Sequence, residues 1–487
     1  MKIHILKDMM TSLFTTSKSI KTPLPLGRGL GVGLLLSLLL SSCGLYNKYE
    51  RPEDLNTKGL IRDLQSDADT LALNTDQNFG NLPWREVFTD PQLQSLIETA
   101  LENNADLRNA ALNVKMMETA LTCAKLAFLP SVAFAPQGTI SQVQMDGVSV
   151  SKTYQLPISA SWNLDLFGNL LSQKRSAQMK LLATKDYQVA VQTKIICGVA
   201  NLYYTLMMLD EQLAIVTDME GLTKDTWDMM QLQMQLGRSR STSVQTAEAN
   251  YYSVQAKKAD LKQQIREMEN SMSLLLNEPG HQIARGKFYN QSLPTNFSAG
   301  VGIQLLSNRA DVHSAEMALA QCFYDTETAR SRFYPNITVT GSAMFTNSIG
   351  TIVNPGKWIL SAVGSLTQPI FQHGQIVAGL KVAKAQQEQA LNTFQQTILK
   401  AGNEVSNALL AYNTCDEKSK LDEKQVKIYE QNVEDTKLLY TSKGSTYLEV
   451  IQAQNGLLNA RISKVTDDFN KMQAVVNLYQ ALGGGSK

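Results

Sequence analysis

Cysteine and histidine, the side chains that most often carry chemistry in proteins, are few and scattered in this chain of 487 residues. The five cysteines and four histidines form no Cys-x-x-Cys pair and no histidine cluster with the spacing of a zinc site. The motifs Gly-x-Ser-x-Gly and His-Glu-x-x-His and the Walker loop are also absent from the sequence. We therefore expect no enzymatic activity, no metal and no cofactor apart from covalent lipid.

One cysteine stands in a setting with a defined chemistry. Cys43 follows 13 uncharged residues, 30–42, and a basic leader precedes that run. Because a helix needs about 20 apolar residues to cross a bilayer, the run is too short to span and predicts a secretory signal peptide over residues 1–42. Leu40-Ser41-Ser42-Cys43 resembles a bacterial lipobox, which would place a diacylglycerol and an N-acyl chain on Cys43. Gly44 favours the outer membrane, and the alternative is an ordinary signal peptide with a chance cysteine.

The charge of the chain gives no reason to expect a nucleic-acid partner. Lysine and arginine number 45 against 44 acidic residues, and the leader is the more basic part, so the mature chain is slightly acidic. The other four cysteines are expected to be isolated and mostly buried thiols: Cys123, Cys197, Cys322 and Cys415.

The chain contains a tandem duplication. Residues 104–132 align without a gap with residues 309–337, and both stretches end in Phe-x-Pro followed by two residues. Weaker matches follow at nearly the same offset. We therefore divide the mature chain into an N-terminal segment with the lipid anchor (43–90), a first repeat (91–280), a linker (281–302) and a second repeat (303–487).

Each repeat predicts the order helix, strand, strand, long helix, helix. The first copy places these elements at 91–129, 131–144, 154–165, 168–236 and 242–276. The second copy places them at 303–334, 336–346, 357–371, 374–442 and 446–482.

The predicted strands alternate in polarity over about a dozen residues. In 154–165, apolar side chains from Tyr154 to Leu164 share one face, and polar ones from Gln155 to Asp165 share the other. This alternation with terminal aromatics is typical of a membrane β-barrel strand, and a soluble sandwich strand is the alternative. Since transmembrane barrels need about eight strands or more, four strands would have to be completed by other chains.

The long helices carry apolar residues at steps of three and four, as coiled-coil seams do. One seam runs from Ile195 to Val216, an equivalent one from Leu391 to Cys415, and a third from Leu458 to Tyr479. A helix of about 69 residues rises roughly 100 Å, twice the length of its predicted neighbours. Two short helices placed end to end would match one long helix, which predicts a helical tube projecting from the strands.

Several stretches together resemble a known family. They are KYERPE after Cys43, PWREVFTDPQLQSLIETALENNADLRNA, ASWNLDLFG, NRADVHSAE and FYPNI. They are similar to the TolC-like outer-membrane efflux proteins, in particular the NodT or OprM-like lipoprotein branch. The resemblance implies an α+β membrane protein, a homotrimer whose four strands per chain form one 12-stranded barrel above a periplasmic α-helical tunnel. It also implies a periplasmic adaptor, an inner-membrane pump of the resistance-nodulation-division type and outer-membrane lipid as partners.

The same resemblance implies roles for the two hairpin turns. Adaptor docking would fall on Gly237, Arg238, Ser239, Arg240, Gly444, Ser445 and Thr446, with the two glycines ending helices. The closed periplasmic aperture would involve Tyr440, Tyr447, Glu449 and Gln452. Gln452 departs from the family, which often has Asp at this position, so an acidic ring would be missing or shifted to Glu449.

Two other functions stay open at this point. A structural or adhesive coiled-coil lipoprotein would account for the helices but not for the strands at matching repeat positions, and the exit duct of a type I polypeptide secretion system would share the whole architecture. The sequence leaves the substrate open among drugs, bile salts, metals and polypeptides.

Overall fold

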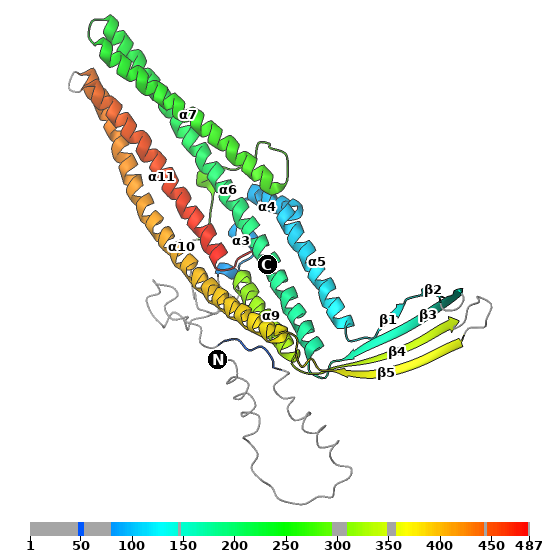
Figure 1. Ribbon diagram of the computed structural model, residues 1–487. Coiled ribbons are helices and arrows are strands. Elements are labelled where there is room, and N and C mark those ends of the chain that lie inside the picture. Colours follow the sequence, from blue (N-terminus) through cyan, green and yellow to red (C-terminus); the bar gives the residue numbers. More distant parts are fainter. Residues whose placement is uncertain are drawn as a thin grey trace, which may run out of the picture. The chain divides into compact units, whose positions relative to one another are not determined.

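The chain repeats one unit of helices and strands, as Figure 1 shows. The computed structural model describes residues 47–52, 79–144, 148–294, 309–347, 357–442 and 446–485. The signal peptide and Cys43 lie outside the described residues, as do Gly444 and Ser445. The contacts below all belong to the unit that begins at Tyr49.

The first copy follows two short helical turns, η3 (Phe79–Asn81) and α3 (Trp84–Val87). Its elements are α4 (Pro91–Asn103), α5 (Ala105–Leu126), β1 (Ser131–Phe134), β2 (Gln137–Gln144), β3 (Val148–Leu164), α6 (Asn169–Gln235) and α7 (Ser241–Leu276). After η4 (Phe288–Asn290), the second copy consists of α9 (Ala310–Ser331), β4 (Asn336–Asn347), β5 (Lys357–Thr367), α10 (Gln375–Thr441) and α11 (Tyr447–Ala481).

The helix predicted over 91–129 is wrong in one respect, because it is broken at Asn104. This residue has an extended backbone (φ −59°, ψ 128°), and its Oδ1 accepts hydrogen bonds from the amides of Asp106 (2.9 Å) and Leu107 (3.2 Å). Asn104 therefore caps the N-terminus of α5. Its Nδ2 also donates to the carbonyl of Leu275 (2.9 Å), which ties the break to the end of α7.

The strand predicted over 131–144 is also divided, into β1 and β2. Both segments pair with β3 in one continuous register, Phe134 opposite Ile158 and Gln137 opposite Gln155. The break falls where Pro136 faces the part of β3 that contains Pro157, and neither proline has an amide hydrogen to donate. The sheet is therefore four strands wide, in the order β1/β2-β3-β4-β5.

The two faces of the sheet differ in polarity, as the alternation predicted. Across β3 and β4, Leu156 pairs with Phe345 and Trp162 with Val339 on one face. The other face is mostly polar, although it includes Met344, Ile359 and Val363, and it contains a hydrogen bond of 2.7 Å between the hydroxyls of Ser342 and Ser361. This arrangement suits a sheet with a lipid-facing side and a water-facing side.

The two long helices, α6 and α10, contain 67 residues each, or about 100 Å of helix. Helices α5 and α9 pack near the strand-side parts of the long helices, while α7 and α11 run back along the far parts (Figure 1). The predicted seams are confirmed: their members are mostly buried, with Val199, Leu206, Val405 and Val476 fully inaccessible. None of the described helices combines the length and apolar character needed to traverse a bilayer.

The cysteines differ in their environments. Cys197 is fully buried, which raises the pKa of its thiol to about 12. Cys322 and Cys415 are half-buried, and Cys123 is exposed, so the expectation of mostly buried thiols is wrong for Cys123. Within the described ranges, no cluster of three or more His, Cys, Asp or Glu side chains could hold a metal ion.

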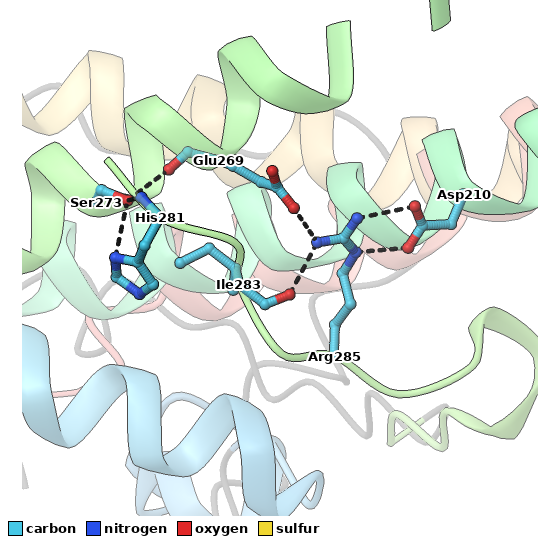
Figure 2. Close-up of polar contacts among 6 residues, drawn as sticks. All are labelled: Asp210, Glu269, Ser273, His281, Ile283 and Arg285. Carbon is cyan, nitrogen blue, oxygen red and sulfur yellow. Dashed lines mark hydrogen bonds and ion pairs between the residues drawn. The ribbon is translucent and has the colours of Figure 1, made fainter. Parts of the chain in front are cut away.

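Arg285, in the segment after α7, forms ion pairs with both helices of the hairpin made by α6 and α7 (Figure 2). Its guanidinium donates two hydrogen bonds to Asp210 on α6 (2.5 and 2.8 Å), one to Glu269 on α7 (2.7 Å) and one to the carbonyl of Ile283 (2.8 Å). The Asp210 hydrogen bonds, opposed by burial, raise the pKa of Arg285 above its ordinary value. Only 10% of the Arg285 side chain and 9% of the Glu269 side chain are exposed.

We expect Arg285→Ala to destabilise the protein by about 3 kcal/mol, because it leaves the buried Glu269 carboxylate without its cation. Thermal unfolding of the purified protein in detergent would measure this. Adding Glu269→Gln should recover part of the loss. Arg461→Ala is the matched control, since its ion pair with Glu430 is far more exposed (32% and 44%) and should be worth about 1 kcal/mol or less. Equal effects of the two arginine changes would contradict this account.

Asp90 joins the start of α4 to the centre of α6. Its carboxylate accepts hydrogen bonds from Tyr203 Oη (2.6 Å), Gln291 Nε2 (2.8 Å) and the amide of Gln92 (2.9 Å). Burial acts to raise the pKa of Asp90, but these hydrogen bonds outweigh it and lower the pKa below the ordinary 3.8. The carboxylate form is therefore the one that the fold stabilises.

A lowered pKa means that Asp90 contributes stability above pH 3.8, and that this contribution is lost as the pH falls through the folded-state value. We expect Asp90→Asn to cost about 1 to 2 kcal/mol at pH 7. The cost should shrink in acid, where the wild-type carboxylate is protonated as well. Unfolding midpoints of both proteins between pH 3 and pH 7 would check this, and a constant difference across that range would rule out a carboxylate role.

Candidate functional site

The first hairpin turn joins α6 to α7 and is built on a glycine. Gly237 has φ +69°, a left-handed conformation that glycine adopts without strain. Its amide donates to the carbonyl of Met234 (2.9 Å), and the amide of Arg238 donates to the carbonyl of Gln233 (2.8 Å). This pair of bonds is a Schellman motif, which ends α6 and reverses the chain. Arg238 and Arg240 are exposed and Ser239 is half-buried.

The second turn joins α10 to α11, and residues 443–445 within it lie outside the described residues. Thr446 precedes α11 with an extended backbone (φ −97°, ψ 153°). Glu449 and Gln452, expected at the aperture, are both exposed on α11. Tyr440 and Tyr447 are half-buried, and burial raises the pKa of Tyr440.

Near their turns the two hairpins share a small apolar cluster, here called the tip cluster. Its buried members are Met230 on α6, Val244 and Ala247 on α7 and Ile451 on α11. Tyr440 and Tyr447 pack against it together with Trp227 and Met229. The two tyrosines thus connect α10 and α11 to the neighbouring hairpin of the same chain.

Hydrogen bonds between uncharged groups also cross from one hairpin to the other. The side chain of Gln454, which is 1% exposed, donates from Nε2 to Thr226 Oγ1 (2.8 Å). Three more bonds are Asn455 Nδ2 to Asn250 Oδ1 (3.1 Å), Gln212 Nε2 to Thr466 Oγ1 (3.0 Å) and Tyr440 Oη to Met230 Sδ (3.6 Å). We call the tip cluster and these four bonds together the hairpin latch.

Two polar atoms in the latch region lack a hydrogen-bond partner although they are buried. They are Gln454 Oε1 and Trp227 Nε1, each with almost no solvent-accessible surface. A buried polar atom without a partner destabilises the arrangement that buries it. The latched arrangement is therefore less stable than its contacts alone would suggest.

Ion pairs, by contrast, join the two helices within a hairpin. Lys258 on α7 pairs with Glu220 on α6 (2.6 Å). Between α10 and α11, Lys418 pairs with Asp467 (2.6 Å), Arg461 with Glu430 (2.6 Å) and Lys471 with Asp416. Each hairpin is thus held together by charged contacts, whereas the latch between them consists of neutral ones.

Sequence reasoning singled out Gln452 but not Gln454, two residues further along α11. The signal was available, because Gln454 falls among the buried positions Ile451, Ala453 and Leu457, where a polar side chain requires a partner. Its partner Thr226 lies 228 positions away, and the sequence alone gave no indication of that pairing.

The chain is similar in sequence and structure to characterised proteins. Residues 96–278 and 302–484 match the family described as outer membrane efflux protein. The solvent efflux pump outer membrane protein SrpC of Pseudomonas putida is 30% identical over 413 residues, covering 82% of this chain and 87% of SrpC. The cation efflux system protein CusC of Escherichia coli K12 is 25% identical over 459 residues, covering 92% of this chain and 98% of CusC. Among solved structures, that of the open state of the Neisseria gonorrhoeae MtrE outer membrane channel is similar to this fold with a TM-score of 0.78. Its sequence is 26% identical, and the match covers 91% of this chain and 98% of MtrE. This chain belongs to the outer membrane efflux protein family and is an outer-membrane efflux channel with a TolC-like fold.

Proposed function

We propose that this protein is the passive exit duct of a tripartite efflux system. Three copies would form the duct, which would receive substrate from an inner-membrane pump of the resistance-nodulation-division type through a periplasmic adaptor. The observation that carries the proposal is the form of the sheet. One of its faces is apolar, and among the described strands β1/β2 and β5 form its two outer edges.

The edges of this sheet support a trimer. Backbone groups along an open edge in lipid cost several kcal/mol each, so the sheet needs further strands on both sides. Three copies of a sheet four strands wide would give a closed barrel of 12 strands, within the range of known transmembrane barrels. Exposed apolar residues along α10 fit burial against a neighbouring copy: Val377, Val382, Leu399, Leu410, Leu421, Ile428 and Leu438.

The hairpin turns form the periplasmic entrance in this proposal. The adaptor would dock on the first turn, Gly237 to Arg240, and on the second, Gly444 to Thr446. The resting duct would be closed around Tyr440, Tyr447, Glu449 and Gln452, and the hairpin latch would keep the α10/α11 hairpin in place. Docking would separate the hairpins and open the entrance, with no chemistry on the substrate.

A lipid on Cys43 would anchor each copy in the outer membrane. The relative SilC of Salmonella typhimurium, 25% identical over 92% of this chain, carries the description probable outer membrane lipoprotein. Replacing Cys43 by Ser and labelling cells with an alkyne-tagged palmitate would test the attachment directly, because only the wild type should take up the label.

The class of substrate can be identified by measuring which compounds accumulate in cells that lack the protein. Cells that lack the protein should retain more dye or bile salt than complemented cells if the partner is a drug pump, and more copper or zinc if it is a metal exporter. The names of the relatives include both solvent and cation efflux, which is why both classes are measured. Unchanged levels of all four would exclude these substrates and favour either polypeptide secretion or a channel whose role is duplicated by another.

A further inference from the structure

The short segment at 49–52, here called the strap, makes specific contacts with α9 in the part of the chain nearest the strands. Arg51 is bidentate on Glu316: Nε donates to Oε1 (2.8 Å) and Nη2 donates to Oε2. The Glu316 side chain is only 6% exposed, whereas that of Arg51 is 51% exposed. The buried carboxylate on α9 therefore obtains its cation from the strap.

Tyr49 provides the second part of the contact. Its amide donates to Tyr324 Oη (3.2 Å), and its ring packs edge-on against Phe323 with centroids 6.0 Å apart. Burial raises the pKa of Tyr49 to about 12, with a smaller contribution from Glu316. Tyr324 is itself nearly buried and lies seven positions before the last residue of α9. The strap thus contacts one face of α9 at two levels about two turns apart, and α9 is followed directly by β4.

We propose that the strap positions the lipid anchor: by holding residues 49–52 on α9, it keeps the acyl chains of Cys43 close to the strands that enter the membrane. This inference rests on the proposed lipidation. It gives a role to the motif KYERPE, residues 48–53, which contains the strap and which the channel function alone does not explain.

The strap can position the anchor because the stretch of chain between Cys43 and Tyr49 is short. Tyr49 lies six positions after Cys43, and six extended residues reach at most about 20 Å. While the strap is bound, the anchor therefore stays within about 20 Å of the position of Tyr49 on α9. Release of the strap from α9 would remove that limit.

The test is a comparison of strap variants with and without the lipid. We expect Arg51→Ala to lower the amount of heat-resistant trimer in the outer-membrane fraction several-fold when Cys43 is present. In a Cys43→Ser background, Arg51→Ala should have no further effect, because there is no anchor left to position. A purely structural contact would give the same fold-loss in both backgrounds, and that result would overturn the proposal, as would no loss in either.

Removing Arg51 alone leaves Glu316 buried without its cation, so a second variant separates this effect. Arg51→Ala combined with Glu316→Gln removes the strap contact without a buried charge and should reproduce the loss in the lipidated background only. Exchanging the charges, Arg51→Glu with Glu316→Arg, should restore trimer. Arg85→Ala is the matched control, since its pair with Glu98 is exposed on both sides (56% and 53%).

Two further measurements on the same strains separate this inference from the functions on which it rests. Palmitate labelling reports the lipidation itself, and dye or metal accumulation, divided by the amount of assembled trimer, reports the channel. If Arg51→Ala is labelled normally and its trimers export normally but are fewer, the strap proposal stands. If the wild type takes up no palmitate, the lipidation has failed, and the strap proposal is overturned with it while the channel function is untouched.

Discussion

Changing Gln454 to Glu should make the closed channel leak. A carboxylate at this position would be buried where the amide is 1% exposed, and it could not donate to Thr226 Oγ1 as the Gln454 amide does. An unpaired buried charge costs about 3 kcal/mol or more, which moves the balance between latched and open hairpins by roughly a hundredfold. Uptake of a large hydrophilic antibiotic such as vancomycin, in cells without the partner pump, would measure the leak independently of export.

The matched control is Asn459→Asp, which adds the same charge at an exposed position of α11 five residues away. It should leave uptake unchanged. The Gln454→Glu leak should also fall as the medium is acidified, because a protonated glutamic acid is neutral and close to glutamine in shape. Equal uptake by the two variants, at equal amounts of trimer, would show that the latch does not keep the entrance closed.

Cross-linking the two hairpins should stop export without disturbing assembly. Asn250 on α7 and Asn455 on α11 are joined by a side-chain hydrogen bond of 3.1 Å, so cysteines at both positions are within reach of a short bis-methanethiosulfonate cross-linker, which links two thiols through reducible disulfides and releases sulfinate. If the hairpins must separate for the duct to open, the cross-linked protein should export at a few per cent of the wild-type rate. A reducing agent should restore export.

Two controls define this experiment. Cysteines at Glu220 and Lys258, which form an ion pair of 2.6 Å within one hairpin, should cross-link without loss of export. Cys123 is exposed and would be replaced by Ser to avoid side reactions. Full export by the cross-linked Asn250 and Asn455 variant would exclude separation of these two hairpins as the opening step, and the protein would still be an efflux channel.

The periodic parts of this fold were predictable from the sequence because each reports a regular geometry. The two-residue alternation around Trp162 specified a two-faced sheet, and the seams from Ile195 and Leu391 specified the long helices to within one residue at each end. The breaks were harder to predict. Asn104 interrupts the first helix because its side chain can cap a new one, and Pro136 divides a strand without changing its register.

The candidate site was less accessible to prediction, since its contacts join residues far apart in the sequence. The turn at Gly237 could be placed from the glycine itself. The bond from Gln454 to Thr226 and the contact of Arg51 with Glu316 span 228 and 265 positions. No local pattern specifies such pairs, and a tandem repeat adds many equivalent alternatives for each helix.

The neutral contacts between the hairpins have a consequence for the surroundings in which the channel works. Small ions pass freely through the outer membrane, so the salt concentration around these helices follows that of the medium. Charged contacts at a surface weaken as the Debye length shrinks from about 10 Å at 0.1 M to 3 Å at 1 M. Amide, hydroxyl and apolar contacts such as Gln454 with Thr226 are not screened in this way. In the proposed mechanism, a duct closed by them would therefore stay shut in dilute and in saline habitats alike, and the signal to open would be left to the adaptor.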